Sequence, residues 1–354
     1  MTRNARIIGV GMWAPERVVP NSWFDQRLGE NVSDWLEVNL TIQERRWCSE
    51  NESTADLATN AGRAALENAG VSADQIDLII VATDTPEYIS PATSAVVQYR
   101  LEATNAGCFD LNAACSGFVA ALDMGAKAIR ADRRTRRVLV IGAYAMSKYL
   151  DMSDKKTVTL FADGAGAVVL EEDPEGTDGG GETGAGSSGG AGAADRVEAD
   201  GSGWLASRLS AAGQYHDWMG IYAGGTRMPV DPAVLERKDH LLKFVRKFPK
   251  EINPTTWERL IREVLDDVGA SPLDVSRFFF TQININSIHE TMEALGAPSE
   301  RAHTIMDRYG YTGSACIPMA LADADEKGLL TRGDLVVFMG SGGGLAFACA
   351  AFRW

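Results

Sequence analysis

The sequence predicts an α/β protein made of two duplicated halves, and two observations lead to that fold class. Apolar runs expected to form strands, at 76–83 and 138–142, alternate with a helical pattern at 94–101. Such alternation is the pattern of α/β domains. The second observation is a repeat, because a segment of the first half recurs about 199 residues later in the second.

The repeat is clearest where a predicted helix ends at a glycine and a polar turn leads into an apolar run. The segments 66–72 and 265–271 share this plan, with Gly70 and Gly269 at the predicted helix ends. Three further pairs follow in order at offsets of about 198 or 199 residues: 79–81 with 278–280, 120–122 with 319–321, and 138–142 with 336–340. Matched elements in one order at nearly constant spacing indicate duplication, whereas any single pair would also suit two unrelated α/β units.

A stretch rich in Gly, Ser and Ala, 174–195, separates the two halves. Its apolar content is too low to offset the entropy of ordering, so we expect a mobile surface loop. A phosphate-binding role for its glycines is disfavoured, because the stretch lacks the Gly-Lys-Ser/Thr ending of such loops. The predicted organisation is an N-terminal half, 1–173, carrying the nucleophile, then this loop, then a C-terminal half, 196–354.

Composition narrows the class of protein. The chain of 354 residues has 45% hydrophobic and 23% charged residues, as expected of a globular domain with a buried core. A formal net charge of −14 disfavours non-specific binding to nucleic acid or to an anionic membrane surface. No apolar stretch reaches the ~18 residues of a membrane-spanning helix, and the N-terminus lacks the apolar region of a signal peptide. We therefore expect a cytoplasmic protein without nucleic-acid or membrane partners.

The cysteines disfavour a disulfide framework, because their number is odd, and they show no CxxC spacing that would bind zinc. They are Cys48, Cys108, Cys115, Cys316 and Cys349. We therefore expect no metal site, and a reducing compartment suits the free thiols.

Cys115 differs from the other cysteines in its predicted position. A predicted strand at 108–111 leads into a turn of small residues, and a helix is expected from Gly117. Near a helix N-terminus the dipole and free N–H groups stabilise a thiolate and lower the thiol pKa. We interpret Cys115 as a nucleophile, and the alternative is a buried structural cysteine.

The residues around Cys115, DLNAACSGF at 110–118, resemble the nucleophile motif of β-ketoacyl-acyl-carrier-protein synthase III, a family within the thiolase superfamily. Three further segments resemble motifs of that family: 160–169, 307–314 and the Gly-rich 340–344. The resemblance implies a thiolase-like five-layered αβαβα sandwich of two duplicated halves, in agreement with the repeat. It also implies a homodimer.

The resemblance further implies acyl transfer through a covalent cysteine intermediate. A coenzyme A thioester, or a phosphopantetheine thioester on an acyl carrier protein, would load its acyl group onto Cys115, and no cofactor would be bound permanently. Backbone N–H groups of Cys115 and Gly343 would form the oxyanion hole, an arrangement worth about 3–4 kcal/mol of barrier. A tight turn alone is the other interpretation of Gly343.

The sequence departs from the family at the residues that assist condensation. Condensing members place a His and an Asn beside the cysteine, whereas Thr281 and Tyr311 stand at those positions here, and Asn284 matches a further asparagine of the motif. The His and Asn donate hydrogen bonds to the thioester oxygen as the carbanion forms, and a Thr hydroxyl cannot carry positive charge. We therefore expect acyl loading to be retained and ordinary malonyl condensation to be impaired.

A replacement base and a donor-binding residue complete the predicted site. We assign His216, in a polar turn beside Asp217, as the replacement base, and an exposed turn histidine is the alternative. Trp35 matches a tryptophan that binds the adenine of coenzyme A in the family, and core packing is the alternative. Asn39 occupies the position of a family arginine there, which leaves a carrier-protein donor open.

These residues predict an acyltransferase of specialised, polyketide- or fatty-acid-like metabolism that passes the acyl group from Cys115 to a second nucleophile. Two alternatives stay open: a true Claisen-condensing 3-oxoacyl synthase with rearranged catalytic residues, and a catalytically silent partner subunit. Retention of the motif around Cys115 disfavours the silent subunit, because such a subunit needs no thiol there.

Overall fold

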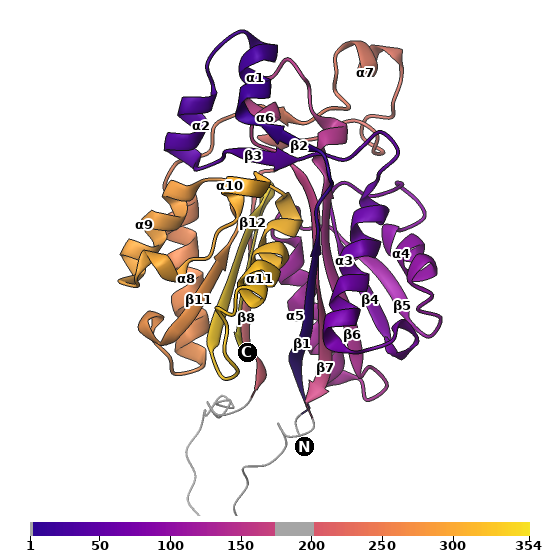
Figure 1. The fold of residues 1–354 in the computed structure, drawn as a ribbon, viewed down its shortest axis with the longest axis vertical. Helices are drawn as coiled ribbons and strands as arrows, with labels where there is room; N and C mark the ends of the chain where they lie inside the picture. The colour runs from indigo at the N-terminus through magenta and orange to yellow at the C-terminus, as the bar shows by residue number, and fades with distance from the viewer. Residues whose placement is uncertain (1–2, 174–201) are drawn as a thin grey trace, which may run out of the picture.

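The structure, a computed structural model, describes residues 3–173 and 202–354. The predicted Gly-rich loop, 174–195, lies outside the described residues. Figure 1 shows both chain ends at one end of the molecule, below the strands. Within the described ranges, no helix has the length and apolar character needed to cross a membrane.

The first half forms a five-stranded mixed sheet in the order β1-β7-β6-β4-β5. Its strands are β1 (Asn4–Trp13), β4 (Leu78–Ala82), β5 (Gly107–Leu111), β6 (Arg137–Ala145) and β7 (Asp163–Asp173). Strands β6, β4 and β5 run parallel, whereas β7 pairs antiparallel with both β1 and β6. Strands β4 and β6 are buried on both faces, which is why they read as continuous apolar runs in the sequence.

The second half repeats this sheet with four strands in the order β8-β13-β12-β11. They are β8 (Gly203–Tyr215), β11 (Val275–Phe280), β12 (Leu335–Gly342) and β13 (Gly344–Arg353). In order they correspond to β1, β4, β6 and β7. The described residues contain no fifth strand in this sheet, and an isolated parallel bridge between Phe278 and Ala302 lies at the free edge of β11.

The main helices complete five layers. They are α3 (Thr54–Ala69), α4 (Thr93–Leu101), α5 (Gly117–Ala131), α8 (Ile252–Asp267), α9 (Ile285–Leu295) and α11 (Cys316–Glu326). Helices α5 and α11 lie between the two sheets and contact strands of both. Helices α3 and α4 cover the outer face of the first sheet, and α8 with α9 covers the outer face of the second (Figure 1). The thiolase-type αβαβα sandwich expected from the resemblance is therefore confirmed.

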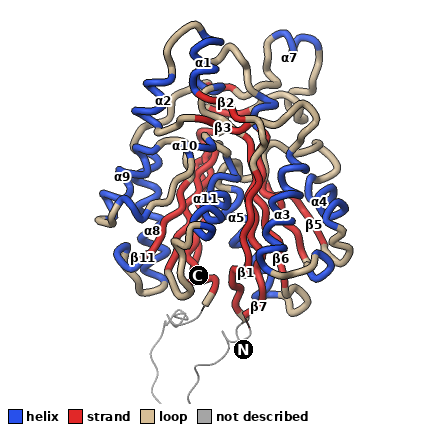
Figure 2. Tube along the Cα trace, in the orientation of Figure 1, coloured by secondary structure: helices blue, strands red, loops and turns tan. Residues whose placement is uncertain are grey.

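Shorter elements cover the end of the molecule opposite the chain ends, where Figure 2 shows mostly loops and short helices. These are α1 (Asn21–Leu28), α2 (Ser33–Leu40), α6 (Lys155–Val158), α7 (Pro232–Glu236), α10 (Met306–Tyr309), β2 (Val18–Pro20), β3 (Glu44–Arg46), β9 (Met219–Gly220) and β10 (Lys243–Phe244). Residues of α2, β9 and β10 line one cavity together with the loops that lead into α5 and follow β12.

The duplicated plan extends to the local hydrogen bonds. Gly70 and Gly269 adopt left-handed φ values of 65° and 66° after their helices. Each is followed by a capping box, with Ser72 in the first half and Ser271 in the second. The repeat of 198–199 residues seen in the sequence is thus a structural duplication. The elements themselves match the expected strands and helices to within a few residues, β4 being shorter and β6 longer than predicted.

Candidate active site

Cys115 lies in the turn between strand β5 and helix α5. The helix begins at Gly117 with Ser116 as its N-cap, so the thiol stands two residues before the first helical residue. Cys115 is 3% exposed, and Ala114 before it has a φ of 47°, which is uncommon for residues other than glycine. The Ser116 hydroxyl donates to the Ala113 carbonyl at 2.7 Å, which fixes the turn.

The glycine turn between β12 and β13 packs directly on this nucleophile turn. A Cβ added to Gly342 would lie 2.6 Å from the Cys115 nitrogen and 2.7 Å from the Ala113 oxygen, so only glycine permits the approach. Gly343, the next residue, lines the same two cavities as Cys115. The two residues predicted to form the oxyanion hole therefore lie together.

Burial dominates the electrostatics of the nucleophile. It raises the pKa of the Cys115 thiol well above its ordinary value, and the nearby Asp84 carboxylate raises this pKa further. A hydrogen bond with the Tyr311 side chain opposes both effects by stabilising the thiolate. The prediction that the helix N-terminus lowers the thiol pKa is therefore wrong in net direction, because desolvation and a like charge outweigh it. In the resting protein the sulfur is a thiol, and attack on a thioester requires a proton acceptor.

One cavity beside Cys115 has a volume of about 280 Å³. We name it the lysine-lined cavity, because Lys247 and Lys250, both exposed, form part of its wall. Trp35 lines it with 56% of its surface exposed, so core packing does not explain this tryptophan. In a chain with a net charge of −14, two lysines beside an exposed indole form a local site suited to an anionic, aromatic ligand.

Two of the predicted pocket residues also line this cavity. Tyr311 is buried, with its ring centroid 5.3 Å from that of Phe161, and its side chain reaches the Cys115 thiol. Asn284 accepts a hydrogen bond from the Asn286 N–H at 3.1 Å as the N-cap of α9. Asn284 therefore both shapes the cavity and begins a helix.

Thr281, predicted to face the substrate, lies behind the cavity wall instead. Its hydroxyl accepts from the Ser341 N–H at 2.8 Å and donates to the Ser341 carbonyl at 3.3 Å. Ser341 lines the lysine-lined cavity, whereas Thr281 lines neither cavity at Cys115. The hydroxyl at the position of the family histidine is therefore already hydrogen-bonded to the backbone of β12.

A second cavity of about 320 Å³ also has Cys115 and Gly343 in its wall, and we name it the Asp84 cavity. Asp84 lies two residues beyond the end of β4. Its Oδ1 atom is buried without a hydrogen-bond partner, and burial raises the pKa of the carboxyl to about 6. Asp84 was not predicted from the sequence, although its position just past the carboxyl end of a buried parallel strand is where such sheets bind ligands.

His216, predicted as the replacement base, lines the Asp84 cavity with an exposed side chain. Its backbone N–H donates to the Gly213 carbonyl at 3.1 Å, which closes the turn after β8. The histidine and Cys115 therefore share one cavity.

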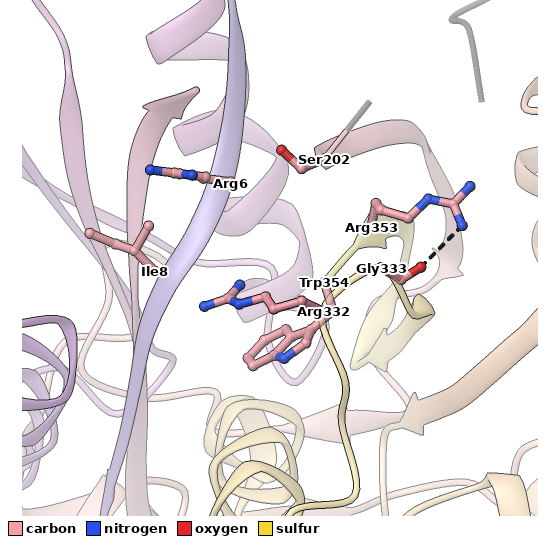
Figure 3. A pocket seen from close by; sticks show the side chains of 7 residues that line it. All are labelled: Arg6, Ile8, Ser202, Arg332, Gly333, Arg353 and Trp354. Atoms are coloured by element: carbon pink, nitrogen blue, oxygen red, sulfur yellow. Dashed lines mark hydrogen bonds between the residues drawn. The ribbon is translucent and has the colours of Figure 1, made fainter. Parts of the chain in front are cut away.

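A larger cavity, about 740 Å³, lies near the chain ends and shares no residue with the two cavities at Cys115. Figure 3 shows Arg6 and Ile8 of β1 on one side of it and Arg332 with Trp354 on the other. Arg332 donates to a backbone carbonyl of β1 at 3.1 Å and lies 5.2 Å from the centre of the Trp354 ring. These contacts join the two halves and do not form part of the cysteine site.

The duplicated sandwich, with a buried cysteine before its central helix, defines a thiolase-fold protein. Two family models match the sequence: "3-Oxoacyl-[acyl-carrier-protein (ACP)] synthase III" over residues 109–189, and its C-terminal counterpart over residues 265–354. The chain belongs to the 3-oxoacyl-acyl-carrier-protein synthase III family.

Relatives and solved structures agree over the full length. The chain is 35% identical to the β-ketoacyl-acyl-carrier-protein synthase III of Roseiflexus sp. (strain RS-1), with 100% of this chain and 99% of the relative aligned. It is 36% identical to the acetoacetyl CoA synthase NphT7 of Streptomyces sp. (strain CL190), covering 99% and 98% of the two chains. The crystal structure of 3-oxoacyl-acyl-carrier-protein synthase III from Aquifex aeolicus VF5 matches with a TM-score of 0.82, 31% identity, and coverage of 99% and 100%.

Proposed function

We propose that this protein is a β-ketoacyl-acyl-carrier-protein synthase III-like acyltransferase. It takes an acyl group from a coenzyme A or carrier-protein thioester onto Cys115 and passes it to a second nucleophile, in specialised, polyketide- or fatty-acid-like metabolism. The observation that carries the proposal is an intact nucleophile turn in a site that lacks both condensation donors.

Acyl loading needs only groups that this chain offers. The Cys115 sulfur attacks the thioester carbon, and the N–H groups of Cys115 and Gly343 hold the oxyanion that forms. The thiol proton passes to His216, which lines the same cavity, and collapse of the oxyanion expels the donor thiol, which takes a proton. The acyl group then remains on Cys115 as a thioester until the second nucleophile attacks it.

Decarboxylative condensation in the family relies on His and Asn donors, and Thr281 and Tyr311 stand at their positions in this chain. A carbanion formed from a malonyl thioester is stabilised by hydrogen bonds to its oxygen, and one such donor is typically worth about 3–4 kcal/mol. Thr281 already donates to the Ser341 carbonyl, and the Tyr311 side chain is engaged with Cys115. The site therefore favours transfer of the acyl group over generation of a carbanion.

The lysine-lined cavity suits the donor. Lys247 and Lys250 match the phosphates of coenzyme A or of a phosphopantetheine arm, and the exposed face of Trp35 matches an adenine ring. An acyl carrier protein, acidic as a class, would meet the same positive groups. The proposal also includes a homodimer in the cytoplasm with no resident cofactor.

A condensing 3-oxoacyl synthase is the second candidate, because relatives at 35–36% identity carry the names of condensing synthases. In that case Tyr311 and His216 would replace the missing donors. A silent partner subunit is disfavoured by the thiol at the junction of two cavities.

Incubation with a panel of acyl-coenzyme A and acyl-carrier-protein thioesters, followed by intact-protein mass spectrometry, tests the proposal. We expect an adduct on Cys115 that disappears in the presence of an alcohol, amine or thiol acceptor. Release of labelled carbon dioxide from malonyl thioester at a rate matching turnover would support the condensing synthase instead. An absence of any adduct across the panel would contradict both enzyme functions.

His216→Ala should slow loading at least tenfold while leaving the circular dichroism spectrum unchanged.

A further inference from the structure

Asp84 has no part in the acyl-loading steps, yet its position is unusual for a carboxyl group. Its Oδ1 atom is shielded from solvent and lacks a hydrogen-bond partner. Three buried apolar side chains, Met146, Phe161 and Leu242, form much of the surrounding wall. A buried polar group without a partner is costly, so such groups are normally completed by protein, water or ligand.

The backbone N–H of Asp84 itself hydrogen-bonds the carboxyl and lowers its pKa, but neither this group nor any other nearby donor pairs with Oδ1. Tyr144 and Tyr149 are close enough for the Asp84 charge to raise the pKa of each phenol, and the Cys115 thiol experiences the same charge. None of these hydroxyl or thiol groups makes a hydrogen bond with Oδ1. Across the cavity, the remaining titratable groups are His216 and Tyr222, and the Tyr222 hydroxyl is itself buried without a partner.

The geometry of the two cavities indicates which part of a substrate meets Asp84. A thioester attacked by Cys115 has two limbs, the thiol carrier and the acyl group, and two cavities meet at Cys115. The lysine-lined cavity offers two positive charges for a phosphate-bearing carrier, whereas the carboxylate in the Asp84 cavity would repel phosphates. The acyl limb therefore occupies the Asp84 cavity.

We propose that the acyl group transferred through Cys115 carries a hydrogen-bond donor, a hydroxyl or an amino group, that pairs with Asp84. This inference rests on the proposed function and specifies its substrate class. Asp84 then determines acyl specificity and is not the base for thiol attack. A plain alkanoyl group would leave Oδ1 unpaired, and a carboxyl-bearing acyl group such as malonyl or succinyl would place a second negative charge beside it.

The test measures the rate of Cys115 acylation with matched pairs of coenzyme A thioesters. The pairs are 3-hydroxybutyryl against butyryl, 4-hydroxybutyryl and 4-aminobutyryl against butyryl, 6-hydroxyhexanoyl against hexanoyl, and 4-hydroxybenzoyl against benzoyl. Quenched samples are read by intact-protein mass spectrometry. We expect at least one donor-bearing member to load about 10- to 100-fold faster than its partner, the range of a hydrogen bond to a charged group. The hydroxyl and amino arms distinguish a neutral from a cationic donor.

Two variants of Asp84 isolate its contribution. Asp84→Leu should abolish the preference and speed loading of the alkanoyl member, while Asp84→Asn should keep part of the preference because its amide oxygen still accepts. Asp74→Asn, a substitution of an exposed acid outside both cavities, is the matched control and should keep the full preference. Alkylation of Cys115 by iodoacetamide and the circular dichroism spectrum report that each variant is folded.

The outcomes separate this inference from the proposed function. If matched pairs load at equal rates, or if the preference survives in Asp84→Leu, the acyl specificity is overturned while acyl transfer stands. If no thioester loads Cys115 in the wild-type protein, the proposed function itself fails, and the specificity fails with it.

Discussion

Each half has a turn before its central helix, and the two corresponding turns differ in what surrounds their polar side chain. Cys115 stands two residues before α5, and Ser314 stands two residues before α11. Each turn packs on a glycine of the other half: a Cβ on Gly342 would lie 2.6 Å from the Cys115 nitrogen, and one on Gly142 would lie 2.3 Å from the Ser314 oxygen. The Ser314 hydroxyl, however, is buried and donates to the Ala143 carbonyl at 2.9 Å.

The difference shows how one scaffold yields a side chain that protein satisfies and another that faces two cavities. Duplication supplies the same helix start and the same close glycine contact twice. At Ser314 the polar side chain is satisfied by protein, so nothing remains for a ligand to complete. At Cys115 the side chain lies at the junction of two cavities, where a bound ligand could reach it.

Removing the side chain at each of these two turns, in separate variants, gives the largest expected effect. Cys115→Ala should eliminate acyl adducts from every thioester, because no other thiol lines the two cavities within the described residues. Ser314→Ala should retain loading and lower the free energy of unfolding by about 1 kcal/mol, the contribution of one buried hydrogen bond. Mass spectrometry and urea denaturation measure the two effects. Persistent adducts in Cys115→Ala, or lost loading in Ser314→Ala, would reverse the assignment of the turns.

The second prediction concerns the residues that follow the two corresponding strands, Asp84 after β4 and Ile283 after β11. Each lines a different cavity at Cys115, one with a carboxyl and the other with an apolar chain. Burial raises the pKa of Asp84 from 3.8 to about 6, so the unfolded chain releases this proton at lower pH than the folded one. Stability therefore falls as pH rises from about 4 to about 6, by up to about 3 kcal/mol, and then levels.

Asp84→Asn removes this cost, and it should stabilise the protein at pH 7–8 and make little difference near pH 4. Urea denaturation at five pH values measures the difference between variant and wild type. Asp74→Asn, at an exposed site, should show no such trend. A difference between Asp84→Asn and wild type that does not change with pH would mean that the carboxyl is neutral or paired across the whole range.

Much of the fold is readable from sequence because its signals are local and repeated. Strands β4 and β6 could be predicted without knowing which strands lie beside them, because strands buried on both faces are apolar throughout. The glycines after α3 and α8 marked the ends of both helices, and the constant offset joined the two halves into one plan.

The site was predictable only where its chemistry is local. The turn around Cys115 carries its own signature, and Gly343 and Tyr311 followed from the family resemblance. The Thr281 hydroxyl is hydrogen-bonded to the Ser341 backbone, which is 60 residues away in the sequence. The residues next to Thr281 therefore give no indication of this hydrogen bond. The direction of the Cys115 pKa shift depends on burial by both halves, which outweighs the helix N-terminus that the sequence reveals.

A third prediction tests the contribution of the second half to the nucleophile. The hydrogen bond from Tyr311 lowers the pKa of the Cys115 thiol, so Tyr311→Phe should raise this pKa further. We expect alkylation by iodoacetamide to require higher pH and acyl loading at pH 7.5 to slow about 10-fold, the equivalent of ~1.4 kcal/mol. Tyr144→Phe, at a buried tyrosine of the Asp84 cavity, is the matched control and should shift the alkylation profile less. An unchanged profile in Tyr311→Phe would remove Tyr311 from thiol activation.

The smallest expected effect comes from the two lysines, and it tests which part of the thioester, the carrier or the acyl group, lies in each cavity. Lys247→Ala and Lys250→Ala should each raise the KM for acyl-coenzyme A about 2- to 5-fold with kcat unchanged, because exposed charges contribute below ~1 kcal/mol each. The same variants should leave acyl-N-acetylcysteamine thioesters, which lack phosphates, unaffected, and high salt should reduce the difference. Lys156→Ala, an exposed lysine outside both cavities, serves as the control. Equal effects on both thioesters would mean that these lysines act on the acyl limb, and the assignment of carrier and acyl group to the two cavities would have to be exchanged.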